Sequence, residues 1–144
     1  MNFNKRVFCQ TAWLTLLLLL CVVGGYAQQE ECATRITLLQ VNDVYQFAPV
    51  DRGTRGGIGR VITLKKQIQK DSPHTLFLFS GDTISPSVES ITYKGAQMIE
   101  AWNVAGLDYA TFGNHEFDFG PGVLLDRIKE SRFGWVAANV IIVL

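Results

Sequence analysis

Short apolar runs alternate with amphipathic stretches along this chain, and that alternation constrains its fold more than any other feature. The apolar runs are rich in β-branched and aromatic residues, as β-strands are, and cover residues 35–41, 75–79, 108–112 and 135–140. The amphipathic stretches between them repeat apolar residues at helical spacing, over residues 56–70, 95–105 and 121–128. This β-α-β-α-β-α-β order predicts an α/β fold with parallel strands joined by crossover helices.

The apolar pattern also predicts how the elements pack. Residues 75–79 are apolar at nearly every position, which indicates a strand buried on both faces of the sheet. Residues 35–41 predict a second buried strand. Met98 and Trp102 lie at helical spacing, so we interpret them as core residues.

Helix-breaking residues and polar stretches predict the connections. The residues expected at helix ends are Asp71, Ser72, Pro73, Gly106 and Pro121. Residues 44–55 carry a proline, a glycine and two arginines and predict a loop, and residues 83–90 predict a Ser/Thr-rich loop.

The N-terminus is typical of a signal peptide. Lys5 and Arg6 precede a Leu-rich run at residues 12–23, and Gly25-Tyr26-Ala27 offers a cleavage site before Gln28. The run is shorter than the roughly 20 residues that cross a bilayer, and an uncleaved anchor is the alternative to cleavage. We therefore expect residues 1–27 to be a signal peptide, residues 28–34 a polar leader and residues 35–144 the folded part. The expected location is secreted or extracellular, or periplasmic in a bacterium, with membrane contact only through the signal or a C-terminal anchor missing from this chain.

Charge and cysteine content exclude several classes of protein. The chain has 13 basic and 13 acidic residues and no basic stripe, so a nucleic-acid duplex is not an expected partner. Of its 3 cysteines, Cys9 and Cys21 fall in the signal peptide, and Cys32 is left alone. A disulfide scaffold is therefore excluded, and Cys32 is either free or paired with something beyond this chain.

Three of the predicted strands end in side chains that suit metal binding or proton transfer. Asn42-Asp43 follows the first strand, Gly81-Asp82 the second, and residues 113–118, Gly-Asn-His-Glu-Phe-Asp, the third. One such stretch alone more often forms a turn or a helix cap. Ligands of open α/β sheets bind outside the carboxyl ends of the strands, so three stretches at this spacing predict one shared site.

The residue types at these strand ends match the chemistry of a two-metal site. Asp43 and Asp82 offer carboxylates to hard or borderline cations, and Asn114 offers an amide oxygen. His115 offers an imidazole, whose N–H Asp118 could accept three residues later. Two cations about 3.5–4 Å apart, bridged by a carboxylate, can clamp a phosphoryl group and generate hydroxide near neutral pH.

Taken together, these stretches resemble the first three motif blocks of the calcineurin-like metallophosphoesterases. Residues 113–118, preceded by Leu107-Asp108-Tyr109, are similar to the secreted 5′-nucleotidase, apyrase and UDP-sugar hydrolase branch. The resemblance runs from about residue 36 to residue 139. It implies that the chain forms half of a four-layer α/β/β/α sandwich and is the N-terminal part of a metallophosphatase domain.

The resemblance also implies a role for each candidate residue. Asp43 would bind the first of two divalent metal ions, such as Zn²⁺ or Mn²⁺, Asp82 would bridge both, and Asn114 would bind the second. His115 would stabilise the transition state or protonate the leaving group, with Asp118 orienting it. The implied substrate is an extracellular nucleotide or another phosphate ester.

The chain departs from the family pattern in two places. Tyr45 stands where the family commonly has a histidine ligand, which indicates a tolerated variant, a changed metal preference or a weakened first site. The resemblance implies further histidine ligands from downstream blocks, but the sequence contains no histidine after His115. The nucleotide-binding domain of the family is also missing from this chain. Glu116 and Phe117 are predicted to be turn and packing residues.

From these features we expect the complete protein to hydrolyse nucleotide phosphate esters or anhydrides, and this chain alone to be inactive or nearly so. Its last four residues are all apolar, which indicates a chain cut off within the fold. The alternatives are a non-catalytic secreted binding protein of the same fold, which Tyr45 favours, and an unstable truncated product. The substrate stays open among those of 5′-nucleotidases, apyrases, UDP-sugar hydrolases and cyclic-nucleotide phosphodiesterases.

Overall fold

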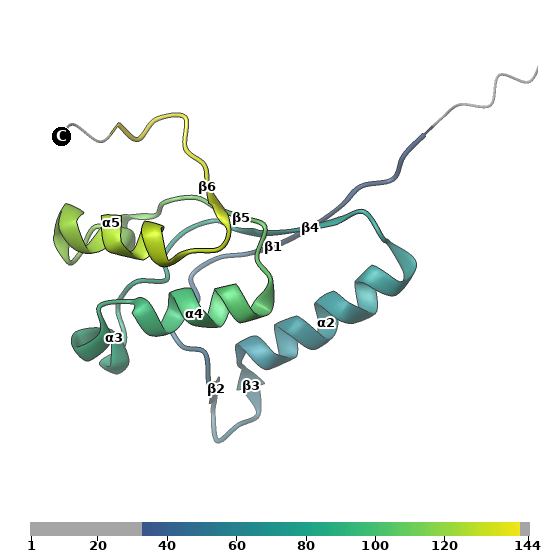
Figure 1. Ribbon diagram of the computed structural model, residues 1–144. Helices are drawn as coiled ribbons and strands as arrows, with labels where there is room; N and C mark the ends of the chain where they lie inside the picture. Colours follow the sequence, from purple (N-terminus) through teal and green to yellow (C-terminus); the bar gives the residue numbers. More distant parts are fainter. Residues whose placement is uncertain (1–32, 142–144) are drawn as a thin grey trace, which may run out of the picture. The chain divides into compact units, whose positions relative to one another are not determined.

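A four-stranded parallel sheet forms the centre of the fold. A computed structural model describes residues 33–141 (Figure 1), so the predicted signal peptide, Cys32 and the last three residues lie outside the described residues. The strands lie in the order β1-β4-β5-β6, with bounds Thr37–Val41, Thr75–Phe79, Tyr109–Ala110 and Gly134–Trp135. All neighbouring pairs in this sheet are parallel, which confirms the predicted α/β class.

Three helices connect these strands where the sequence predicts them. They are α2 (Ile58–Asp71), α4 (Ala96–Ala105) and α5 (Gly120–Glu130). The predicted ends hold, because Ser72 caps α2 and Gly106 ends α4 in the left-handed conformation at φ 67°. Pro121 lies in the first turn of α5, where its missing N–H costs no hydrogen bond.

Lys65 is a polar residue on the apolar stripe of α2, and the structure explains its position. Its ammonium donates to the carbonyl oxygens of Ala105, at 3.1 Å, and Gly106. These carbonyls belong to the C-terminal end of α4, where the helix leaves acceptors unsatisfied and favours a positive charge. Lys65 therefore joins two neighbouring helices.

Three local predictions were wrong. The predicted loop at residues 44–55 contains an antiparallel hairpin, β2 (Pro49–Val50) and β3 (Arg55–Gly56), turned by left-handed residues at 51–53. The predicted loop at residues 83–90 gives way to a short helix, α3 (Val88–Tyr93), whose N-terminus Ser87 and Ser90 cap reciprocally. The last strand, β6, covers two residues and not the predicted run at 135–140.

The core lies between the sheet and the helices on one of its faces. Phe77 and Phe79 point inward from β4, and both rings contact Trp102, at centroid distances of 6.0 and 4.9 Å. Met98 and Trp102 are fully buried, which confirms their assignment to the core.

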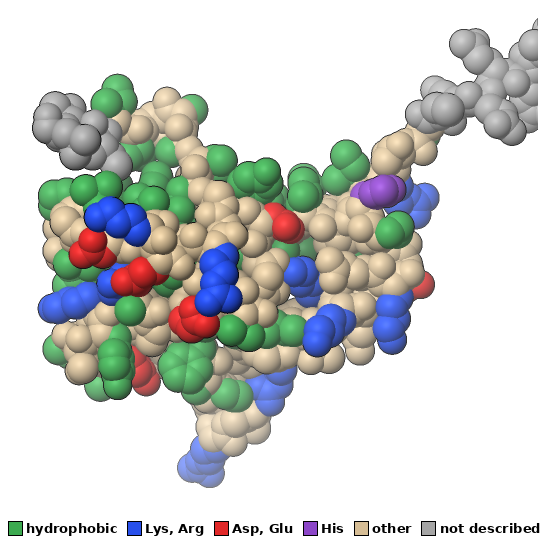
Figure 2. Space-filling model, in the orientation of Figure 1, with side chains coloured by type: hydrophobic (Ala, Val, Ile, Leu, Met, Phe, Trp, Pro, Cys, Tyr) green, Lys and Arg blue, Asp and Glu red, His purple; other side chains and the backbone are tan. Residues whose placement is uncertain are grey.

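The opposite face of the sheet is open over the described residues, so the predicted burial of both faces of β4 was wrong, and so was the prediction that β1 is a buried strand. Figure 1 shows α2 and α4 on the same side of the sheet, as expected when strand order follows chain order and every crossover is right-handed. Alternate strand residues therefore face outward; Leu38, for example, is 63% exposed. We call Leu38, Leu76, Tyr109 and Val136 the open sheet face. Figure 2 shows hydrophobic side chains along the upper edge of the molecule, on the side of the sheet away from α2 and α4. Among the described helices, none has the length and apolarity needed to span a membrane.

Candidate functional site

The loops that follow β1, β4 and β5 meet at the carboxyl end of the sheet. The backbone N–H of Asp43 donates to the carbonyl of Gly81 at 3.1 Å. The backbone N–H of His115 donates to Oδ1 of Asp82 at 2.9 Å. The structure therefore brings the three predicted stretches together, as the positions of the parallel strands require.

The backbone at this meeting point is unusual. Asp43 and Asp82 both adopt left-handed conformations, at φ 56° and 70°, which few residues other than glycine adopt. A Cβ on Gly113 would lie 2.1 Å from Oδ1 of Asp82, and a Cβ on Gly81 would lie 2.5 Å from the nitrogen of Gly113. The two glycines thus allow a closer approach of these loops than any side chain would permit.

Asp43 is held as a carboxylate by two neighbouring donors. The side chain of Asn42 donates to its Oδ2, and the hydroxyl of Tyr45 donates to its Oδ1 at 2.8 Å. These bonds, that of Asn42 foremost, lower the pKa of Asp43. The same bond with Asp43 raises the pKa of Tyr45 to about 12, so the phenol stays neutral near pH 7.

His115 and Asp118 form the pair that the sequence predicts. Nδ1 of His115 lies 2.7 Å from Oδ2 of Asp118, and this contact raises the pKa of the imidazole. Asp118 also accepts from the hydroxyl of Ser85, and this bond, together with His115, lowers the pKa of its carboxyl group. The ring of Tyr45 meets that of His115 edge-on, with centroids 5.8 Å apart, so the pair lies beside Asp43.

Sequence reasoning undervalued one residue that builds this site, Glu116, and missed two others, Thr83 and Ser85. Glu116 is 1% exposed, and its carboxylate accepts backbone N–H groups from both neighbouring loops, a larger role than the predicted turn residue. Thr83 donates to the carbonyl of Val44 at 2.8 Å and accepts from the indole of Trp102 at 2.9 Å. Only the returning half of a capping box is present, in which Glu116 at N3 accepts from the backbone N–H of Gly113 at the N-cap, and a glutamate three residues after a strand-ending glycine is the signal that could have revealed it.

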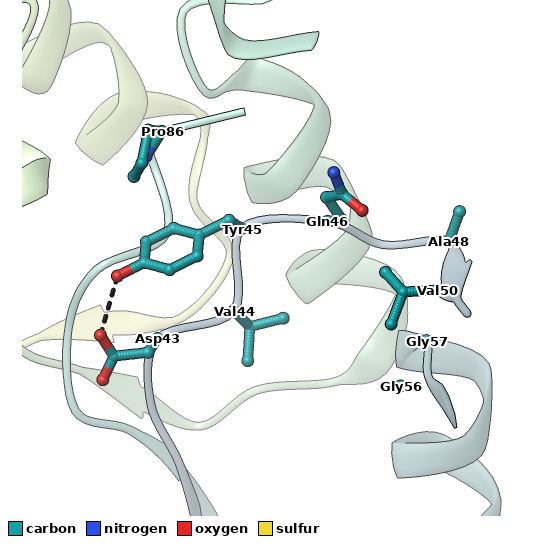
Figure 3. Close-up of a pocket in the computed structure, with 9 residues that line it drawn as sticks. All are labelled: Asp43, Val44, Tyr45, Gln46, Ala48, Val50, Gly56, Gly57 and Pro86. Atoms are coloured by element: carbon teal, nitrogen blue, oxygen red, sulfur yellow. Dashed lines mark hydrogen bonds between the residues drawn. The ribbon is translucent and has the colours of Figure 1, made fainter. Parts of the chain in front are cut away.

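A pocket of about 390 Å³ opens beside Asp43. Figure 3 shows Tyr45 and Pro86 on one side of it and Val50 with Gly56 and Gly57 on the other. A second hollow of about 510 Å³ includes Asp118. Asp43 and Asp118 therefore border open, partly apolar hollows.

The donors present fit an oxygen-preferring cation in part. Asp43, Asp82 and Asn114 offer oxygen ligands from three converging loops, and Asn114 is exposed. Over residues 33–141, however, no group of three or more histidine, cysteine, aspartate or glutamate side chains is close enough to hold a metal ion. Tyr45, as a neutral phenol bound to Asp43, is a poor ligand for Zn²⁺ or Mn²⁺.

Comparison with known families identifies the fold. The family described as "Calcineurin-like phosphoesterase" matches residues 36–143, most of the chain. The chain belongs to the calcineurin-like phosphoesterase family. The parallel α/β sheet described above is that of the family's metallophosphatase fold, and members of this family depend on metal ions.

Similar proteins include several 5′-nucleotidases. A 5′-nucleotidase of Mus musculus is 33% identical over 119 residues, which cover 75% of this chain and 21% of the relative. A snake venom 5′-nucleotidase of Gloydius brevicauda is 31% identical over 117 residues, covering 73% and 20%. The solved structure of a 5′-nucleotidase precursor from Thermus thermophilus superposes with a TM-score of 0.66 at 32% identity, covering 72% and 22%. The chain therefore spans about a fifth of the length of the relatives it matches.

Proposed function

We propose that this chain is the N-terminal part of a secreted, metal-dependent hydrolase of nucleotide phosphate esters or anhydrides, of the 5′-nucleotidase type. The observation that carries the proposal is the convergence of Asp43, Asp82 and the His115–Asp118 pair at one end of the sheet. Family membership and the 5′-nucleotidase relatives support the reaction class. The signal-like N-terminus and the venom relative support secretion.

In this proposal each converging side chain has one task. Asp43, Asp82 and Asn114 would hold two divalent cations, with Asp82 between them. When bound, the cations would neutralise phosphoryl charge and lower the pKa of water. In the protonated imidazolium, Nδ1–H of His115 donates to Asp118, and the second proton, at Nε2, would pass to the departing oxygen of the substrate.

The 144-residue chain by itself is proposed to be inactive or nearly so. Half of the expected donor set has no counterpart in its sequence, because no histidine follows His115. Nucleotide hydrolysis by this chain that disappears with chelator and with Asp82→Asn would contradict this part of the proposal.

The test of function uses the complete gene product. Phosphate release from a nucleoside 5′-monophosphate should require Mn²⁺ or Zn²⁺ and stop with chelator. Asp82→Asn should lower kcat/KM by about 100-fold or more, because the bridging ligand is lost. Asp126→Asn is the matched control, since this exposed carboxylate on α5 pairs only with Lys129 among the described residues. A complete protein that hydrolyses no nucleotide with either metal would refute the proposal.

Tyr45 favours a second candidate, a non-catalytic secreted binding protein of the same fold. Its neutral hydroxyl occupies Oδ1 of Asp43, where a histidine ligand would leave that oxygen available to a cation. Replacing Tyr45 by histidine in the complete protein separates the two candidates. A hydrolase should keep or gain activity in this variant, whereas a binding protein should bind nucleotide without releasing phosphate from it.

A further inference from the structure

Glu116 is a carboxylate placed where carboxylates are rarely found. Its side chain is 1% exposed, in the short helix η1 (Asn114–Glu116). A buried charge is unfavourable unless hydrogen bonds compensate it. Three backbone N–H groups do so: those of Asp82, at 2.9 Å, Thr83, at 2.7 Å, and Gly113, at 2.6 Å.

These three donors belong to two different loops, and both loops carry proposed metal ligands. Oε2 of Glu116 accepts from the N–H of Asp82 itself and from that of Gly113, the residue before Asn114. One carboxylate oxygen therefore fixes the backbone positions of two ligand residues relative to each other. Bonds from amides to a charged acceptor are shorter and stronger than neutral ones, which suits this task.

The two loops would not hold this arrangement by packing alone. Asp82 is in a left-handed conformation, and its Oδ1 lies close to the bare Cα of Gly113. The backbone N–H of His115 turns back to the same oxygen at 2.9 Å. A strained residue persists only where its surroundings fix it, and Glu116 supplies two of the bonds on the adjoining amides.

We propose that Glu116 is a positioning residue that sets the geometry of Asp82 and Asn114 for divalent cations. It is not itself a ligand, because both its oxygens are occupied by backbone amides and its side chain is buried. The proposal rests on the proposed function, since it assigns Asp82 and Asn114 to a metal site.

Glu116→Gln is the most informative change. Glutamine has almost the same shape, but one of its terminal atoms is an NH₂ group, which would face a backbone N–H instead of accepting from it. Either orientation breaks a bond to Thr83 or the shared bonds to Asp82 and Gly113. Loss of such supporting partners typically weakens metal affinity by about 10- to 100-fold.

The experiment compares the complete gene product with its variants by NMR. Mn²⁺ should broaden the amide signals of Asp43, Asp82 and Asn114 in the wild type, and Glu116→Gln should raise the apparent Kd by about tenfold or more. Thr75→Val is the matched control. It removes the hydrogen bond that the hydroxyl of the buried Thr75, at the opposite end of β4, donates to the carbonyl of Ser72, and it should leave the Kd unchanged. Glu116→Asp keeps the charge on a shorter side chain and should fall between the wild type and Glu116→Gln.

Hydrogen exchange on the wild type tests the same idea without a variant. The amide protons of Asp82, Thr83 and Gly113 should exchange more slowly than that of the exposed Asn114, and equal rates would overturn the proposal. An unchanged Mn²⁺ affinity in Glu116→Gln would overturn the positioning role of Glu116 and leave the proposed function standing. A complete wild-type protein with no Mn²⁺-dependent broadening would count against the metal site and thus against the proposed function as well.

Discussion

At Gly113 two loops come so close that a single methyl group would not fit between them. Gly113→Ala would place a Cβ 2.1 Å from the carboxylate of Asp82, so we expect a loss of about 1–3 kcal/mol in the free energy of unfolding. Gly122→Ala in α5 is the control, because its Cβ would meet nothing within 4 Å and alanine favours helices. Urea denaturation of both variants measures the difference, and equal stabilities would contradict the close approach.

The His115–Asp118 pair predicts how stability depends on pH. Since the pKa of His115 is raised above its ordinary 6.5, its contribution is complete below that pH and is lost as pH rises through the folded-state pKa. Since the pKa of Asp118 is lowered below its ordinary 3.8, its contribution is present above that pH and is lost on acidification. The pair should therefore stabilise the fold most between about pH 4 and 6.5.

Thermal unfolding of the wild type and Asp118→Asn tests this predicted pH dependence. The difference in Tm between them should be largest in that window and should shrink above about pH 7. Asp126→Asn should show no comparable change between about pH 6 and 8. A difference that grows toward alkaline pH would mean that the two side chains do not form an ion pair.

At the scale of single elements, α3 depends on its cap. Six residues are too few for a helix to be stable by propensity alone, so the reciprocal bonds between Ser87 and Ser90 should matter. Ser87→Ala should cost about 1 kcal/mol in the free energy of unfolding. Thr63→Ala in α2 is the control, because the Thr63 hydroxyl only bonds back to the carbonyl of Gly59 within its own helix. A cost no greater than that of Thr63→Ala would argue against the cap.

The sequence predicted the long elements because their signals are local. Apolar residues at helical spacing, with glycine or proline at the helix ends, predicted α2, α4 and α5. The helix α3 was missed because serine at both ends of a capping box looks like a loop. The burial of residues 75–79 was misjudged because a continuous apolar run does not show whether one or both faces of the strand are covered.

In the candidate site, too, local signals were predicted and contacts between distant residues were not. Residue type and position after a strand predicted the candidates Asp43, Asp82, Asn114, His115 and Asp118, whose loops the structure brings together. Ser85 and Thr83 were missed because their contacts join residues 33 and 39 positions apart, which no local pattern encodes. Glu116 was named but undervalued, since two of its three partners, Asp82 and Thr83, come from another loop.

At the scale of the whole described fold, the open sheet face governs how this chain behaves in solution. Exposed apolar surface of this kind promotes self-association. Replacing Leu38 by lysine and Leu76 by threonine should reduce association in light scattering, while the Tm changes little, because both side chains face outward. Phe77→Ala, on the covered face of the same strand, should instead cost about 3–5 kcal/mol. Equal effects from the two faces would refute the one-sided packing.

The strand order β1-β4-β5-β6 has a consequence for how the molecule is made. Each strand of the sheet pairs with the one synthesised just before it, so no strand waits for a distant partner as the chain leaves the ribosome. Asp43 and Asp82 thus leave the ribosome before Asn114, and Glu116, two residues after Asn114, then joins the loops of Asp82 and Gly113. The strand order therefore lets the candidate site form in the order in which its residues are translated.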